Sequence, residues 1–154
     1  HATQYTDATG TPATTKWGLA AGGDGAAFTT AANWASAFST SRYIKFTFPT
    51  YVPASATVNS ATLKNYYRPT ASGRNACWYF EVYQGTTLIG THGSAASPIS
   101  CNSTTTYTTD SVALPEVNTP ARANSVVVKG YYNISGSGTR TTQHDLVTLN
   151  VTYG

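Results

Sequence analysis

Charged residues are scarce in this chain. Asp, Glu, Lys and Arg make up 10% of its 154 residues, whereas roughly 25% is typical of a soluble globular domain. The basic residues stand apart from one another and form no run that phosphate groups could meet, which argues against nucleic acid as a partner. No apolar stretch approaches the ~20 residues that a membrane-spanning helix requires, so we expect no membrane span.

Methionine is absent, even at position 1, and no hydrophobic signal segment is present. We interpret the chain as a mature exported protein, either secreted or displayed at a cell surface. It contains two cysteines, Cys77 and Cys101, which can close one disulfide loop of about 24 residues. Such a crosslink is typically worth ~2–4 kcal/mol. A pair of buried free thiols is the alternative, and neither cysteine has a partner at the spacing of a metal site.

The polarity that is present comes from Thr, Ser, Asn, Gly and Tyr, and Thr and Tyr favour strands over helices. Short alternating segments separated by Gly, Pro, Ser and Asn predict an all-β fold, an antiparallel β-sandwich of the jelly-roll or Ig-like kind. The expected strands cover residues 43–48, 60–67, 77–83, 88–92, 125–134 and 145–153. The SGSGT stretch at 135–139 predicts a hairpin turn, after which Val147, Leu149, Val151 and Tyr153 are expected to face inward.

The length fits a single domain over residues 1–154, in which residues 1–15 can form an extended N-terminal strand segment. Two stretches interrupt the strand pattern. The first, rich in Gly and Ala, covers residues 18–38, and its residues 33–38 can make a turn of helix or a loop. The second, residues 94–107, is expected to be a surface loop held by the disulfide.

Residues Arg42 to Tyr67 resemble the secreted β-sandwich modules called DNRLRE domains. In that family a strand of the form RxxLxFxL leads through P-x-G-A-x-V-x-S-A-x-L into the next strand. The matching positions here are Arg42, Phe46, Phe48, Val52, Pro53, Ala56, Val58, Ser60, Ala61 and Leu63. Ser55 replaces the usual glycine. The resemblance implies a β-sandwich in a secreted or cell-surface protein, and it carries over no binding residue.

An N-terminal histidine raises the possibility of copper chemistry. A histidine brace holds copper through the terminal amine and imidazole of His1 and a second imidazole, for which His92 and His144 are the candidates. Neither lies in a motif known from polysaccharide oxygenases. The six carboxylates are scattered, so no glycosidase pair is indicated. Asp24 in GGDG is more typical of a turn than of a calcium site. We expect no catalytic residue, no metal and no cofactor.

Tyrosine is abundant, with 11 residues in the chain. Sugar rings pack on aromatic planes, and neighbouring polar groups can bind their hydroxyls. The candidate glycan contacts are Tyr66, Tyr67, Tyr79, Tyr83 and Tyr131, although tyrosine is also a common cross-strand partner. Three sequons, at Asn102, Asn133 and Asn150, are glycosylation candidates, and chance sequons are expected in so Ser- and Thr-rich a chain.

The N-terminal stretch HATQYTDATGTPATT alternates Thr3, Tyr5 and Asp7 with Ala2, Gln4 and Thr6. An extended segment of this kind can add to the sheet edge of another subunit. We therefore predict a non-enzymatic structural or adhesive surface protein that self-associates into an extracellular fibre or pilus-like filament. Its strand-exchange segment would be Ala2, Thr3, Gln4, Tyr5 and Thr6. A carbohydrate-binding module is the alternative, followed by a copper oxygenase built around His1.

Overall fold

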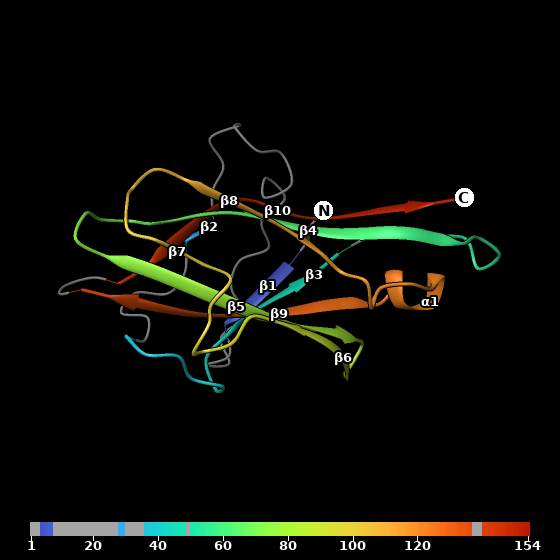
Figure 1. Cartoon of the computed structure of the whole chain (residues 1–154), viewed down its shortest axis with the longest axis horizontal. Helices are drawn as coiled ribbons and strands as arrows, with labels where there is room; N and C mark the ends of the chain where they lie inside the picture. The colour runs from blue at the N-terminus through green and yellow to red at the C-terminus, as the bar shows by residue number, and fades with distance from the viewer. Residues whose placement is uncertain (1–3, 8–27, 30–35, 49, 137–139) are drawn as a thin grey trace.

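The computed structural model describes residues 4–7, 28–29, 36–48, 50–136 and 140–154. These residues form two packed antiparallel sheets (Figure 1). The six-stranded sheet has the order β1 (Gln4–Asp7), β3 (Ile44–Thr47), β9 (Val126–Ser135), β5 (Asn75–Gln84) and β6 (Thr87–His92), and β7 (Ser100–Asn102) also pairs with β5. The four-stranded sheet has the order β2 (Phe28–Thr29), β10 (Thr142–Tyr153), β4 (Val58–Pro69) and β8 (Thr108–Ala113). The predicted antiparallel β-sandwich is therefore confirmed.

The predicted hairpin between β9 and β10 is wrong. β9 pairs with β3 and β5, whereas β10 pairs with β4 and β2 in the opposite sheet. The connection that includes the SGSGT stretch thus crosses from one sheet to the other. By contrast, β5 and β6 form a true hairpin around Gly85, whose φ of 60° is a left-handed conformation that glycine adopts without strain.

Strand alternation builds the core as expected. In β5, Trp78, Phe80 and Val82 are at most 1% exposed, while the residues between them face outward. The same period buries Ile44 and Phe46 on β3. In β10, Val147 and Leu149 are buried, but the inward position expected for Tyr153 is wrong because this residue is 46% exposed. The end of β10 therefore extends beyond the core.

The segment that resembles DNRLRE modules supplies core residues. Phe46, Phe48, Val52, Val58, Ala61 and Leu63 are all buried. Pro53 bends the chain, and its carbonyl accepts a hydrogen bond from Ala56 N at 3.0 Å. These positions thus have a structural role, as the sequence analysis expected.

Four short elements were not expected from the sequence: β2, β7, β8 and a helix. β8 is the polar stretch TTDSVA, whose alternation of half-buried and exposed residues includes few apolar positions. The short helix α1 (Pro120–Ala123) begins after Thr119, whose hydroxyl accepts a hydrogen bond from Arg122 N at 3.2 Å. A Thr cap followed by Pro is a helix-start signal that the sequence does contain.

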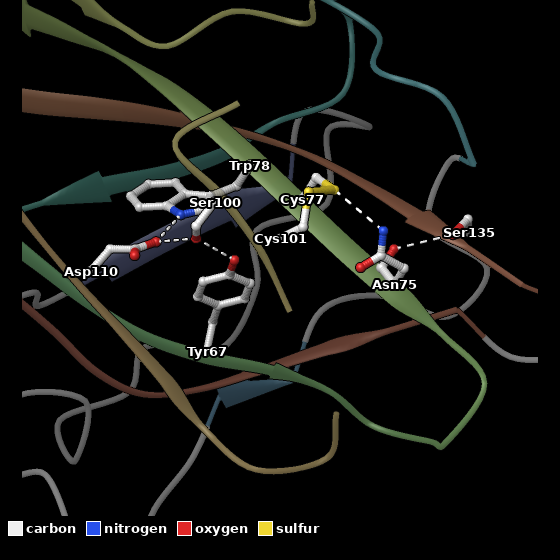
Figure 2. The surroundings of a disulfide bond; sticks show 8 residues. All are labelled: Tyr67, Asn75, Cys77, Trp78, Ser100, Cys101, Asp110 and Ser135. Carbon is white, nitrogen blue, oxygen red and sulfur yellow. Dashed lines mark hydrogen bonds between the residues drawn. A yellow bond between two sulfur atoms is a disulfide. The ribbon is translucent and has the colours of Figure 1, made fainter. Parts of the chain in front are cut away.

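The predicted disulfide joins Cys77 to Cys101, which lie directly opposite each other on β5 and β7. Ser100–Asn102 form β7, so the expectation that residues 94–107 are a surface loop is wrong in part. Ser100 next to the disulfide belongs to a hydrogen-bonded group that also includes Tyr67, Trp78 and Asp110 (Figure 2). The disulfide thus holds the short strand whose serine connects the two sheets.

We predict that the double variant Cys77→Ala/Cys101→Ala loses ~2–4 kcal/mol of unfolding free energy, because the crosslink no longer restricts the unfolded chain. Urea denaturation of the variant, with the reduced wild-type protein as control, measures this loss. A variant as stable as the oxidised wild type would show that β5–β7 pairing alone holds this edge.

Candidate interaction surfaces

The outer face of the six-stranded sheet carries a cluster of tyrosines. Tyr79 on β5 and Tyr131 on β9 lie opposite each other and stack, with ring centroids 4.9 Å apart. Tyr43 meets the edge of Tyr131 at 5.8 Å, and Phe38 meets Tyr79 at 5.0 Å. Because outward positions recur every second residue, Tyr83 lies on the same face as Tyr79. We call Tyr43, Tyr79, Tyr83 and Tyr131 the tyrosine face.

Two opposite charges stand within the tyrosine face. Glu81 Oε1 accepts hydrogen bonds from the hydroxyls of Tyr83 at 2.9 Å and Tyr131 at 2.5 Å. Lys129 Nζ lies 4.6 Å from the ring centre of Tyr43 and 4.7 Å from that of Tyr83. Glu81 and Lys129 are opposite in register, yet within the described residues they form no ion pair with each other. Each charge is held by aromatic groups instead.

This environment keeps the phenols protonated. Burial, followed by the hydrogen bond to Glu81, raises the pKa of Tyr83 to about 12. The same two causes raise the pKa of Tyr131 above its ordinary value, and burial raises that of Tyr79. The tyrosines therefore act as hydrogen-bond donors over the whole physiological pH range.

The remaining candidate glycan contacts are less accessible or isolated. Tyr67 is fully buried and its hydroxyl hydrogen-bonds Ser100 Oγ at 2.7 Å, so its assignment as a glycan contact is wrong. Tyr131 is 5% exposed, so it contributes to the tyrosine face mainly by packing against Tyr43 and Tyr79. Tyr66 is half-buried on β4, in the other sheet. The predicted set is therefore divided among two outer faces and the core.

His144 is a core residue, so its candidacy as a copper ligand is wrong. It is fully buried, its Nδ1 lies 2.9 Å from Asn65 Oδ1, and its Nε2 lies 3.1 Å from Thr142 Oγ1. The Asn65 amide donates to Tyr132 OH at 3.0 Å, which leaves Asn65 Oδ1 as the acceptor for the imidazole N–H. Burial lowers the pKa of His144 to about 3. This histidine is neutral and bonded on both nitrogens.

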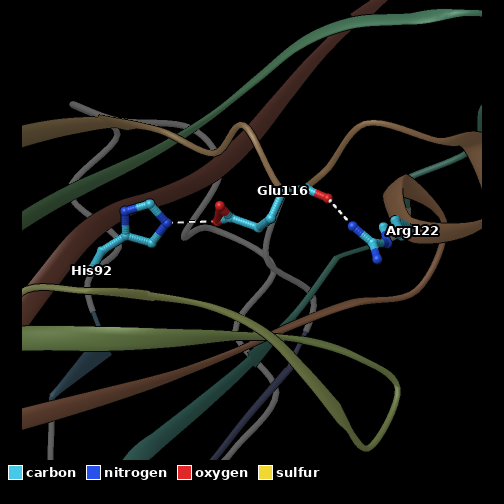
Figure 3. A network of polar contacts seen from close by, with 3 residues as sticks. All are labelled: His92, Glu116 and Arg122. Carbon is cyan, nitrogen blue, oxygen red and sulfur yellow. Dashed lines mark hydrogen bonds and ion pairs between the residues drawn. The ribbon is translucent and has the colours of Figure 1, made fainter.

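His92 has a different partner. Its Nε2 lies 2.6 Å from Glu116 Oε1, and the Glu116 carbonyl accepts a hydrogen bond from Arg122 Nη1 at 2.9 Å (Figure 3). The imidazole also stacks on Phe80 at 4.9 Å. These contacts fasten the connection before α1 onto β6. His1 lies outside the described residues, so a copper site formed by His1 and His92 stays a prediction.

No group of three or more His, Cys, Asp or Glu side chains that could hold a metal occurs in the described ranges. Asp110 Oδ2 accepts hydrogen bonds from Trp78 Nε1 at 2.6 Å and Ser100 Oγ at 2.5 Å. Asp110, Glu81 and Glu116 thus all have structural partners. Asp24 lies outside the described residues. Over the described part of the chain, no helix is long and apolar enough to cross a membrane.

The three sequon asparagines differ in exposure. Asn102 is 3% exposed, and its side-chain amide donates to the carbonyls of Tyr67 at 3.0 Å and Thr106 at 2.8 Å. Its assignment as a glycosylation site is therefore wrong for the folded chain. Asn133 is half-buried and Asn150 is exposed. Modification at these two asparagines stays a prediction.

The N-terminal segment is paired within its own chain. Gln4 to Asp7 form β1, which runs antiparallel to β3 in the register Gln4↔Thr47 to Asp7↔Ile44. Ala2 and Thr3 of the predicted strand-exchange segment lie outside the described residues. Within the described residues β1 pairs with β3 alone, so it is an edge strand of four residues.

A second edge lies on the same side of the sandwich. β2 pairs with β10 at Gln143 and His144, and no other described strand pairs along this side of β10. Phe46 on β3 contacts His144 on β10, with ring centroids 6.1 Å apart, which places the β1–β3 edge over this edge. We call Val147 to Tyr153, on the side away from β4, the open edge of β10.

A groove of about 310 Å³ runs beside the open edge of β10. It is lined by Thr50, Tyr51, Val52, Leu149, Asn150, Val151 and Tyr153. Tyr51 is 77% exposed, and none of the lining side chains is charged. The groove was not predicted from the sequence, because its two walls are about 100 residues apart in the chain.

Comparison with known proteins finds no family model, no curated protein and no solved structure that matches this chain. The resemblance of residues 42–67 to DNRLRE modules therefore stays a prediction.

We predict that protonation of His144 destabilises the protein in acid. The pKa is lowered by folding from 6.5 to about 3, so its contribution to stability is complete above pH 6.5 and is lost as the pH falls towards 3. The loss approaches ~1.4 kcal/mol per pH unit. Chemical denaturation between pH 7 and pH 5 of wild type and His144→Gln measures it, because every other ionisable group is common to the two proteins. Equal slopes for the two proteins would contradict this account.

Proposed function

We propose that this protein is a non-enzymatic, exported structural or adhesive surface protein whose subunits self-associate by β-strand addition into a fibre or filament. The observation that carries the proposal is the position of β1, a four-residue edge strand that, within the described residues, pairs with β3 alone. A strand in this position can exchange between subunits without opening the rest of the sheet. The disulfide is consistent with an extracellular location.

Strand exchange requires enough chain between β1 and β2 to reach a neighbouring subunit. The sequence places 20 residues between the two strands, and any fully extended chain of that length spans on the order of 60 Å. Because β1 and the open edge of β10 lie on one side of the sandwich, a rigid contact between these edges would close two copies into a dimer. An open-ended filament therefore requires β1 to leave β3 and cross to a neighbour.

The low charge of the chain favours close contact between subunits. Only 10% of its residues are charged, and the net charge is +3. Repulsion between identical subunits is correspondingly weak. Main-chain hydrogen bonds, which require no particular side chain, would supply the attraction.

We predict that Tyr5→Pro/Thr6→Pro abolishes self-association, because two successive prolines remove one backbone N–H from each side of β1. The matched control is Gln4→Ala/Thr6→Ala, which changes side chains in β1 but keeps its backbone donors and should assemble like wild type. Size-exclusion chromatography with light scattering, and electron microscopy over a concentration series, measure the outcome. Wild-type protein that stays monomeric at millimolar concentration would refute the proposed function.

The tyrosine face supports a second candidate function, the binding of a neutral polysaccharide. It combines tyrosine rings with a carboxylate and an ammonium group that do not neutralise each other directly. Sugar hydroxyls can donate to Glu81 and accept from Lys129 while C–H groups contact the rings. With one negative and one positive group, the face has no net charge, so it would favour an uncharged glycan.

For this second function we predict that Tyr83→Ala weakens polysaccharide binding by about 2- to 13-fold, as expected for the loss of one aromatic contact of ~0.5–1.5 kcal/mol. Tyr66→Ala, on the other sheet, is the matched control and should bind like wild type. Affinity gel electrophoresis in soluble β-glucan, xylan and galactomannan measures the difference. Unretarded migration of wild-type protein in all three gels would eliminate the tyrosine face as a glycan site.

A further inference from the structure

The open edge of β10 presents backbone groups to the groove. Leu114 N donates to Ala61 O at 2.9 Å, so the backbone groups of Ala61 point towards β8 and away from β10. Val151 is opposite Ala61, and in an antiparallel pair its N–H and C=O therefore also point away from β4. The backbone groups of Gly154 point the other way, towards the residues that precede β4, because they exchange hydrogen bonds of 3.0 and 2.9 Å with Thr57. Leu149, Val151 and Tyr153 thus direct their backbone groups towards the groove.

The far wall of the groove is held in place. The side chain of Asn124 binds both backbone groups of Val52, accepting from its N–H at 2.6 Å and donating to its carbonyl at 2.9 Å. Val52 itself is 1% exposed, which anchors the segment in the core. Tyr51, which is 77% exposed, and Tyr153 on β10 both line the groove. The groove is therefore a built feature with one hydrogen-bonding wall and one aromatic wall.

We infer that this groove is the acceptor site for strand addition and that its occupant is the β1 segment of a second copy of this chain. This inference rests on the proposed function and names the surface that receives the strand. Three properties match the occupant to the site. The site has no charged lining residue, and three of the four residues of β1, Gln4, Tyr5 and Thr6, are uncharged, while Asp7 stands at the end of the strand. Tyr5 can pack between Tyr51 and Tyr153.

The third property is length. In its own chain β1 pairs with β3 over four residues, while the open edge of β10 extends from Val147 to Tyr153. The open edge of β10 is therefore long enough to pair with the whole of β1. Transfer is then favoured once the subunit concentration offsets the entropy of association.

The test uses two full-chain variants with complementary defects. The donor variant is Tyr5→Pro/Thr6→Pro, and the acceptor variant is Tyr51→Asp/Tyr153→Asp, which places two carboxylates where a seated strand would bury them. Both altered tyrosines are exposed, so the acceptor variant should fold, as thermal unfolding will verify. Leu88→Asp is the matched control, because Leu88 is 49% exposed and lies on β6, at the other side of the sandwich.

We expect neither variant to self-associate, with the dissociation constant raised at least about tenfold, and we expect an equimolar mixture to form a 1:1 heterodimer by light scattering. The Leu88→Asp control should assemble like wild type. If the acceptor variant assembles normally while the donor variant does not, strand exchange stands and the β10 assignment is overturned. A monomeric mixture, or equal loss in the Leu88→Asp control, also overturns it. A monomeric wild type refutes the proposed function and this inference together.

Discussion

The indole of Trp78 determines how the two sheets meet. Its ring stacks on Phe80 and Tyr132, with centroids 5.0 and 5.7 Å away, and its N–H must find an acceptor because the side chain is 1% exposed. That acceptor is Asp110, on β8 of the opposite sheet. A hydrogen bond between sheets has stricter geometry than apolar packing. Together with the Ser100–Tyr67 and Asn65–Tyr132 hydrogen bonds, this contact fixes how the two sheets align.

Two adjacent tyrosines on β9 show how strand position divides the core from the outer face, although Tyr131 is itself only 5% exposed. Tyr132 faces inward, where its hydroxyl accepts from Asn65, while Tyr131 faces outward and donates to Glu81. Burial and partners, not residue type, decide which tyrosine can meet another molecule. The same division separates buried Tyr67 from Tyr51, which is 77% exposed beside the open edge of β10. Tyrosine content alone therefore overstates the binding surface of a β-sandwich.

The sequence was sufficient to locate the long strands and most of their inward residues, because alternation has a direct physical cause in the pleat. It missed β2, β7 and β8, and it placed Tyr153 inward. It predicted the inward set of β5 and the pairing of Cys77 with Cys101. It was insufficient for sheet assignment, since β9 and β10 have the periodicity of hairpin partners yet belong to different sheets. His144 was misjudged for a related reason. Nothing in its own strand indicates that Asn65 and Thr142 hydrogen-bond both of its ring nitrogens in the core. The groove beside β10 depends on distant segments and had no local signature.

In the described residues, the edges at β6 and β10 differ in how they are protected from pairing with another strand. At β6, the Glu116 carboxylate lies so close to Gly90 that a Cβ there would be 2.6 Å from its carbon, and His92 pairs with the same carboxylate. Charge and a covering connection thus protect that edge, a common defence against unwanted pairing. The open edge of β10 has neither a charged residue from Val147 to Tyr153 nor a proline. Asn124 moreover holds Val52, and hence Tyr51, beside this edge. Within the described residues, this edge therefore lacks the protection that β6 has, and the proposed strand addition requires an edge of this kind.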